Sequence, residues 1–218
     1  MGQPQTKSER QSRYTVEEYL AKDRASEGRY EYLDGFVYAM AGESGSHADI
    51  CTNLTIAIGA QLRGQDCRAR SKDTKVRSAR APEPGTVMKG LFSYPDLVVV
   101  CGEPQYMDDH RDVLLNPSVI VEVLSDSTEA YDRGEKFRRY RESLPTLTDY
   151  LLVSQDRPVI DHYRRGADDE WVLVTYFGLD TSLRLDSINC AVNLADLYDR
   201  IEFPSEAELR EKEPDPEK

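Results

Sequence analysis

The sequence predicts a mixed α/β fold in which a central mixed β-sheet is flanked by helices. Apolar residues recur every four positions between residues 47 and 63, which is the spacing of an amphipathic helix. Two apolar runs, at residues 94–101 and 117–125, have the composition of strands that are buried on both faces. Asp34-Gly35 separates two short strand-like segments and so indicates a tight hairpin.

The remaining elements follow from local signals. Thr15-Val16-Glu17-Glu18 has the form of a capping box and predicts a helix over 15–25, and Pro145 ends a helix predicted from residue 127 to 143. Strands are expected at 29–33, 36–40, 68–76, 149–154, 157–164, 170–177 and 183–192, and a short helix at 194–201. We expect a disordered segment at 1–14, one domain at 15–203 and an acidic tail at 204–218.

Composition limits the class of protein. The 218 residues carry a formal net charge of −12, which argues against simple electrostatic attraction to nucleic acid. No window approaches the roughly 18 apolar residues of a membrane span, and the first 14 residues are too polar for a signal peptide. The four cysteines are widely spaced, so we expect reduced thiols, a cytoplasmic protein and no zinc cluster.

Two basic stretches leave two interpretations open. One stretch contains Arg63, Arg68, Arg70, Lys72, Lys75, Arg77 and Arg80, and the other contains Arg133, Lys136, Arg138, Arg139 and Arg141. Either they are solvated faces balanced by nearby acids, or they form a rim that contacts phosphates around an acidic site.

Each of the two apolar runs contains one acidic residue. Asp96 opens the first run and Glu122 interrupts the middle of the second. A buried carboxylate costs several kcal/mol unless a cation or hydrogen-bond donors compensate it. If the two strands are neighbours, the two carboxylates form a site for Mg²⁺ or Mn²⁺, which suits phosphodiester hydrolysis. The alternative for either residue is an ordinary salt bridge in the sheet.

The chain resembles the Uma2 (DUF820) family of restriction-endonuclease-like proteins in the PD-(D/E)xK superfamily. The resemblance rests on the segments YEYLDGFVY from residue 30, His47, YPDLVV from 94, PSVIVEVLS from 117, DRGEKF from 132 with Tyr140, and DYLLV from 149. It covers roughly residues 15–200. It implies a restriction-endonuclease-like core and a Mg²⁺-dependent nuclease site, with Asp96 and Glu122 as metal ligands and Glu31 as an additional catalytic acid.

One position departs from the superfamily pattern, which places a lysine two residues after the second carboxylate. Leu124 occupies that position here. An ammonium group there would position the attacking water and stabilise developing negative charge. We expect Lys136, on the helix that follows the Glu122 strand, to supply this cation, although it can equally be a solvated helix lysine.

Two further residues have open roles. Glu31 can give the metal a third carboxylate or pair with a basic residue of the next helix. His47 lies after a Gly/Ser loop at a helix N-terminus, where it can bind a substrate phosphate or transfer a proton, or simply satisfy loop carbonyls.

The sequence therefore favours a Mg²⁺-dependent DNA endonuclease that works as a homodimer, with each subunit cutting one strand. The main alternative is a catalytically inactive module that binds nucleic acid or a protein on the same fold. A third hypothesis is a metal-dependent phosphoesterase that acts on a small substrate.

Overall fold

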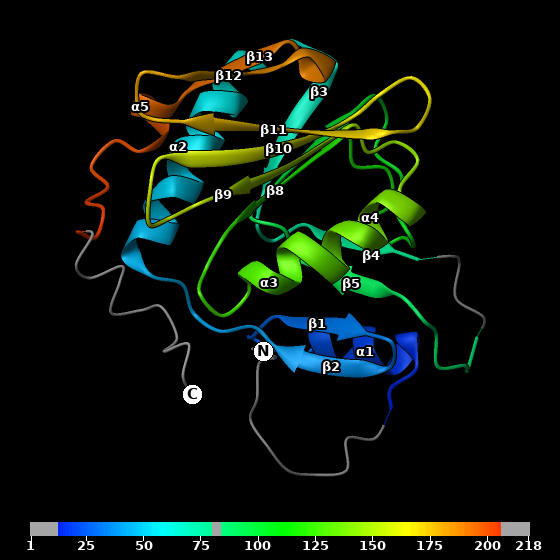
Figure 1. Ribbon diagram of the computed structural model, residues 1–218. Coiled ribbons are helices and arrows are strands. Elements are labelled where there is room, and N and C mark those ends of the chain that lie inside the picture. The colour runs from blue at the N-terminus through cyan, green and yellow to red at the C-terminus, as the bar shows by residue number, and fades with distance from the viewer. Residues whose placement is uncertain (1–12, 80–83, 206–218) are drawn as a thin grey trace.

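The structure is a computed structural model that describes residues 13–79 and 84–205. It contains two larger sheets and one two-stranded sheet, with helices packed against them (Figure 1), which confirms the predicted mixed α/β class. Apart from residues 13–14 and 204–205, the predicted disordered segment and the predicted acidic tail lie outside the described residues. No helix in the described part of the chain has the length and apolar character that crossing a membrane requires.

The larger sheet has six strands in the order β11-β10-β9-β8-β6-β3. These are β3 (Cys67–Ser71), β6 (Leu97–Cys101), β8 (Val119–Val123), β9 (Asp149–Val153), β10 (Val159–Arg165) and β11 (Trp171–Phe177). The two apolar runs of the sequence become β6 and β8, which pair antiparallel, whereas β8 and β9 are parallel. The sheet is therefore mixed, as expected.

A second sheet was not predicted. Its five strands are β1 (Tyr30–Leu33), β2 (Phe36–Ala39), β4 (Lys75–Ser78), β5 (Leu91–Ser93) and β7 (Val113–Leu114), in the order β2-β1-β5-β4-β7. The predicted strand at 68–76 is in fact two strands, β3 and β4, that belong to different sheets. β5 and β7 have only three and two residues, which carry too little periodicity to be recognised, and their partners are distant in sequence.

The predicted hairpin and the first helix are confirmed. Asp34 and Gly35 have φ angles of 51° and 95°, the positive values that a two-residue type I′ turn requires. Helix α1 (Val16–Arg24) begins at Thr15 with the complete capping box and packs its buried face on the second sheet.

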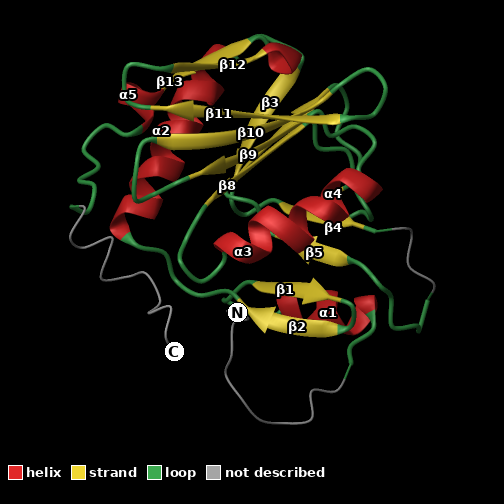
Figure 2. Ribbon diagram, viewed as in Figure 1, coloured by secondary structure: helices red, strands yellow, loops and turns green. Residues whose placement is uncertain are grey.

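The other helices cover the two faces of the large sheet (Figure 2). Helix α2 (Gly45–Gln61) lies on one face with α5 (Leu194–Leu197) and the hairpin β12 (Ser182–Leu185) and β13 (Cys190–Asn193). The opposite face carries a single helical segment made of α3 (Glu129–Tyr131), a π-helix (Asp132–Lys136) and α4 (Phe137–Ser143). Figure 1 shows this segment between the two sheets, where it can touch both.

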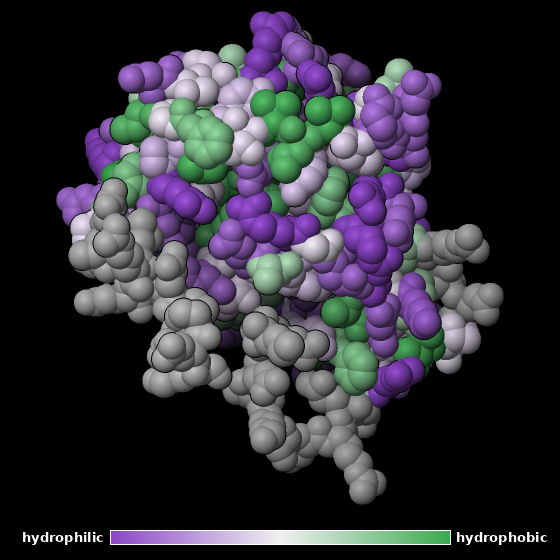
Figure 3. Space-filling view, viewed as in Figure 1, coloured by the Kyte–Doolittle hydropathy of each residue, from purple (hydrophilic) through white to green (hydrophobic). Residues whose placement is uncertain are grey.

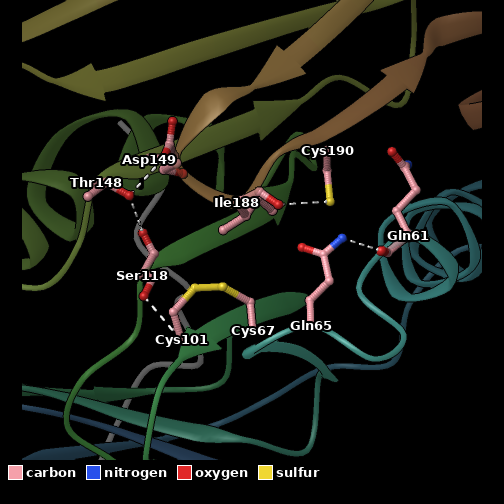
Figure 4. The surroundings of a disulfide bond; sticks show 10 residues. Gln61, Gln65, Cys67, Cys101, Ser118, Thr148, Asp149, Ile188 and Cys190 are labelled. Atoms are coloured by element: carbon pink, nitrogen blue, oxygen red, sulfur yellow. Dashed lines mark hydrogen bonds between the residues drawn. A yellow bond between two sulfur atoms is a disulfide. The ribbon is translucent and has the colours of Figure 1, made fainter.

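The prediction that all four cysteines are reduced is wrong. Cys67 and Cys101 form a disulfide, because β3 and β6 pair in a register that sets the two residues directly opposite each other (Figure 4). A separation of 34 residues gave no sign of this pairing. Cys51 and Cys190, the other two cysteines of the described chain, are buried free thiols.

Candidate functional site

Asp96 and Glu122 are neighbours across the β6–β8 pair. Asp96 directly precedes Leu97, the first residue of β6, and Leu97 pairs with Val121, so Asp96 and Glu122 are the next residues along the two antiparallel strands. The backbone N–H of Val123 donates to Asp96 Oδ2 at 2.7 Å. The side chain of Glu122 is 5 % exposed and that of Asp96 is 14 % exposed. The structure therefore places the two acids opposite each other on interior strands of the sheet, where β6 begins, with Asp96 closer to solvent.

The π-helix supplies two more charged groups. Asp132 and Lys136 begin and end it, and both are buried. Lys136 Nζ lies 3.1 Å from Glu122 Oε1 and 3.0 Å from Asp132 Oδ1. The Tyr150 hydroxyl donates to the Asp132 carbonyl at 2.9 Å and so holds this irregular turn against the sheet. Single π-turns are frequent at functional sites, because the extra residue redirects side chains within a helix.

The fourth carboxylate comes from the second sheet. Glu31 lies on β1, and its Oε1 accepts a hydrogen bond from the backbone N–H of Tyr94 at 3.3 Å. The same oxygen is 3.9 Å from Lys136 Nζ. The cluster thus combines one strand of the small sheet, two strands of the large sheet and the helical segment between them.

The cluster holds more negative charge than its own cation offsets. Burial raises the pKa of Glu122 well above its usual range and also raises that of Glu31. Burial alone would lower the pKa of Lys136, but the carboxylates of Asp132, Glu122 and Glu31 raise it well above its ordinary value. Asp132 Oδ1 is buried, and the cation beside it is Lys136 Nζ, at 3.0 Å. Three carboxylates around one ammonium group, with the carboxylate of Asp96 on the neighbouring strand, fit a hard divalent cation.

Leu124 and Lys136 lie differently relative to the carboxylates. Leu124 is buried in the apolar cluster that contains Phe137 and Tyr140, so its position offers no cation. Lys136 instead reaches the carboxylates from the helical segment, which is where the sequence led us to expect a cation. Sequence reasoning assigned no role to Asp132 or to Tyr140, whose hydroxyl donates to Glu122 Oε1 at 3.1 Å. The spacing of Asp132 and Lys136 within the DRGEK segment was the available signal.

His47 lies beside the cluster, in the first turn of α2. Its Nε2 is 3.1 Å from the Val123 carbonyl and 3.4 Å from Asp96 Oδ2. Burial lowers the pKa of His47, but hydrogen bonds to Asp96 and Cys51 outweigh it and raise that pKa to about 11. Burial also favours the neutral form of Asp96, but the hydrogen bond from His47 and its charge lower the pKa of that carboxyl. His47 therefore holds Asp96 in its ionised form.

The expectation that Cys and His form no metal-ligand cluster is also wrong. Glu43, His47 and Cys51 each offer a ligand atom, and these atoms lie within 4.8 Å of one another. The three residues are four positions apart, at the start of α2 and along one face of it. The expectation failed because it considered only Cys and His, and the third ligand is a glutamate.

Several cations of the two basic stretches are paired with acids: Lys72, Lys75, Arg133, Lys136, Arg138 and Arg139. Lys75 is fully buried against Asp23, at 2.7 Å, and Asp112, at 3.3 Å. Arg139 binds Asp34 and Glu135. The structure thus favours balanced charge over a free phosphate-binding rim for these residues.

The fold and the site define a restriction-endonuclease-like protein. Residues 16–195 match the model of the family Uma2, described as "Putative restriction endonuclease". The chain belongs to the Uma2 family.

The chain is also similar to individual proteins. "Uncharacterized protein slr1290" of Synechocystis sp. (strain ATCC 27184 / PCC 6803 / Kazusa) is 35 % identical over 187 residues, which are 86 % of this chain and 92 % of that protein. "Uncharacterized protein sll1609" of the same organism is 29 % identical over 164 residues, or 75 % and 88 % of the two chains. The crystal structure of a putative nuclease belonging to DUF820 from Anabaena variabilis ATCC 29413 superposes with a TM-score of 0.68 at 16 % identity. It covers 87 % of this chain and 99 % of its own. The structural likeness supports the fold.

Proposed function

We propose that this protein is a Mg²⁺-dependent DNA endonuclease whose site is formed by Glu31, Asp96, Glu122 and Lys136. The observation that carries the proposal is the position of Lys136, whose Nζ lies within 4 Å of Glu31, Glu122 and Asp132. A lysine among buried acids is the donor set of this nuclease class, and the family supports the reaction.

Asp96 and Glu122 would hold the Mg²⁺ ion, with Mn²⁺ as a substitute, and Glu31 and Asp132 lie close enough to assist. When bound, such an ion lowers the pKa of a coordinated water and offsets charge on the leaving oxygen. Lys136 remains charged and directs its ammonium group at the carboxylates, so it can orient the attacking water and stabilise negative charge on the phosphate. His47 acts beside this site by orienting Asp96, in addition to the substrate contact that the sequence suggests.

Plasmid cleavage tests the proposal. We expect the chain to nick or linearise DNA with Mg²⁺ or Mn²⁺ and to lose this activity in Asp96→Asn and in Glu122→Gln. Glu142→Gln is the matched control, because Glu142 is exposed on α4 and pairs only with Arg138 among the described residues. Cleavage that survives in both site variants would reject the assignment. Carboxylate-dependent metal binding without cleavage would favour the inactive binding module.

We also propose that the protein is a cytoplasmic homodimer that pairs through β11. This strand is at the edge of the large sheet and contains no charged residue. Val172, Leu173, Val174 and Phe177 are all exposed, Phe177 by 66 %, and Figure 3 shows hydrophobic side chains gathered over this part of the molecule. Unprotected edge strands pair readily with a second copy. Light scattering should give the mass of a dimer for the wild-type chain and that of a monomer for Val174→Lys. A monomeric wild-type chain would reject the homodimer.

A further inference from the structure

The start of helix α2 carries a second group of metal-ligand atoms, separate from the carboxylate cluster. Glu43 lies just before the helix, and His47 and Cys51 follow at intervals of four residues. His47 and Cys51, spaced in this way, stack on one face of the helix, and Glu43 lies one turn earlier, next to the N-cap residue Ser44. The backbone N–H of His47 donates to Ser44 Oγ at 3.1 Å, and this hydrogen bond fixes the first turn of α2, on which the arrangement of the side chains depends.

The distances match a tetrahedral zinc site. His47 Nδ1 is 3.6 Å from Cys51 Sγ and 3.0 Å from Glu43 Oε2. For Zn–S and Zn–N bonds of about 2.3 and 2.1 Å, a tetrahedral ion separates sulfur from nitrogen by about 3.6 Å and nitrogen from a carboxylate oxygen by about 3.4 Å. The three side chains therefore need only small adjustments to bind one ion.

The remaining polar atoms of Glu43 and His47 already have the partners that a zinc site requires. Lys72 pairs with Glu43 Oε1, which leaves Oε2 facing His47. The second nitrogen of His47 is 3.4 Å from Asp96 Oδ2 and 3.1 Å from the Val123 carbonyl. Histidines that bind zinc characteristically donate their other ring N–H to a carboxylate or carbonyl. Cys51 is buried, whereas the Glu43 side chain is 33 % exposed, so an ion can enter from solvent on the glutamate side.

We propose that Glu43, His47 and Cys51 form a three-ligand site for Zn²⁺ or a similar thiolate-binding divalent ion. The ion would replace the proton on His47 Nδ1 and the thiol proton of Cys51, and both protons would leave to solvent. Thiolate and imidazole ligands favour Zn²⁺ over Mg²⁺, so this site and the carboxylate cluster would take different metals. The His47 ring joins them, because an ion at Nδ1 keeps the proton of Nε2 directed at Asp96.

Co²⁺ is the probe that tests this site, because a cobalt–thiolate bond gives a charge-transfer absorption that carboxylate ligands do not give. The metal-free full chain, kept without reductant to preserve the Cys67–Cys101 disulfide, should gain this band with one equivalent of Co²⁺. Zn²⁺ should remove the band and excess Mg²⁺ should not. Absence of the band in the wild-type chain would overturn the proposal.

Two substitutions localise the band. Cys51→Ala should abolish it, whereas Cys190→Ala should retain it, because Cys190 is the other buried free thiol. A band that persists in Cys51→Ala would overturn the proposal. If circular dichroism shows that Cys51→Ala is unfolded, Glu43→Gln decides instead. This substitution at a partly exposed side chain should weaken Co²⁺ binding by about tenfold or more, and unchanged affinity would overturn the assignment. The readout is absorption, so it is independent of whether the protein cuts DNA.

Discussion

Lys136 Nζ and Glu122 Oε1 lie 3.1 Å apart, although one comes from a π-helix and the other from the middle of a buried strand. The pair is almost completely shielded from solvent, with side chains 7 % and 5 % exposed. A buried ion pair contributes little net stability, because desolvation offsets the attraction. We infer that this pair is retained for the chemistry of the site.

Lys136→Gln should reduce the rate of DNA cleavage by about 10²–10³-fold, the usual loss when a donor that stabilises developing charge is removed. Adding Leu124→Lys should restore part of the rate, because residues 122 and 124 face the same side of β8 and the superfamily has its lysine at this second position. Single-turnover rates of the single and double variants check this, and circular dichroism verifies that the double variant folds. Full activity in Lys136→Gln would contradict the assignment.

The π-helix is the second target. Deleting Gly134 should convert the π-turn to a regular α-helix and rotate Asp132 by about 100° relative to Lys136, so cleavage should be lost while the fold persists. Gly134→Ala is the control, because an added Cβ would meet nothing within 4 Å, and it should keep wild-type activity. Cleavage and thermal unfolding should be measured on both. Retained cleavage in the deletion would show that the π-turn has no part in the site.

Binding of Mg²⁺ should strengthen as pH rises. Burial raises the pKa of Glu122, so part of its carboxyl is protonated when the chain is metal-free, and the ion must displace that proton. The same shift makes the folded chain hold this proton more tightly than the unfolded chain does. The free energy of unfolding should therefore fall as pH rises above the ordinary value of 4.5 toward the raised pKa. Calorimetry in buffers of different ionisation enthalpy should detect proton release, and Glu122→Gln should reduce it. Affinity that does not change between about pH 5 and about pH 8 would contradict this prediction.

The fold depends on a buried lysine outside the site. Lys75 Nζ lies 2.7 Å from Asp23 Oδ2, and both side chains are almost fully buried. Lys75→Met should lower the free energy of unfolding by about 3–5 kcal/mol, because it leaves Asp23 buried without its cation. Arg184→Met removes an exposed ion pair with Asp186 and should cost no more than about 1 kcal/mol. Urea unfolding of both variants measures the two losses in the free energy of unfolding. Equal losses would show that the buried pair contributes no more to stability than the exposed pair.

The sequence was sufficient for every strand of the large sheet except β3, and for the main helices around it. Buried apolar runs such as Val119–Val123 and the capping box at Thr15 depend on neighbours in sequence, and local patterns report these faithfully. The second sheet could not be predicted, because β5 and β7 have three and two residues and are defined only by long-range pairing. The Cys67–Cys101 disulfide was missed for the same reason, since it depends on strand register.

Only part of the site could be predicted from the sequence. Asp96 and Glu122 stood out because a charge inside an apolar run is costly. Asp132 did not, because an acid on a charged helix looks like an ordinary surface residue. Only the π-turn, which no propensity scale reports, buries it.

The central claim is that carboxylates from separate parts of the chain bind one hard metal ion. Isothermal titration calorimetry of the metal-free protein with Mg²⁺ tests this claim most directly. We predict one ion per chain for the wild type and for Glu142→Gln, and no measurable binding for Asp96→Asn or Glu122→Gln. Wild-type affinity in both of these site variants would contradict the claim.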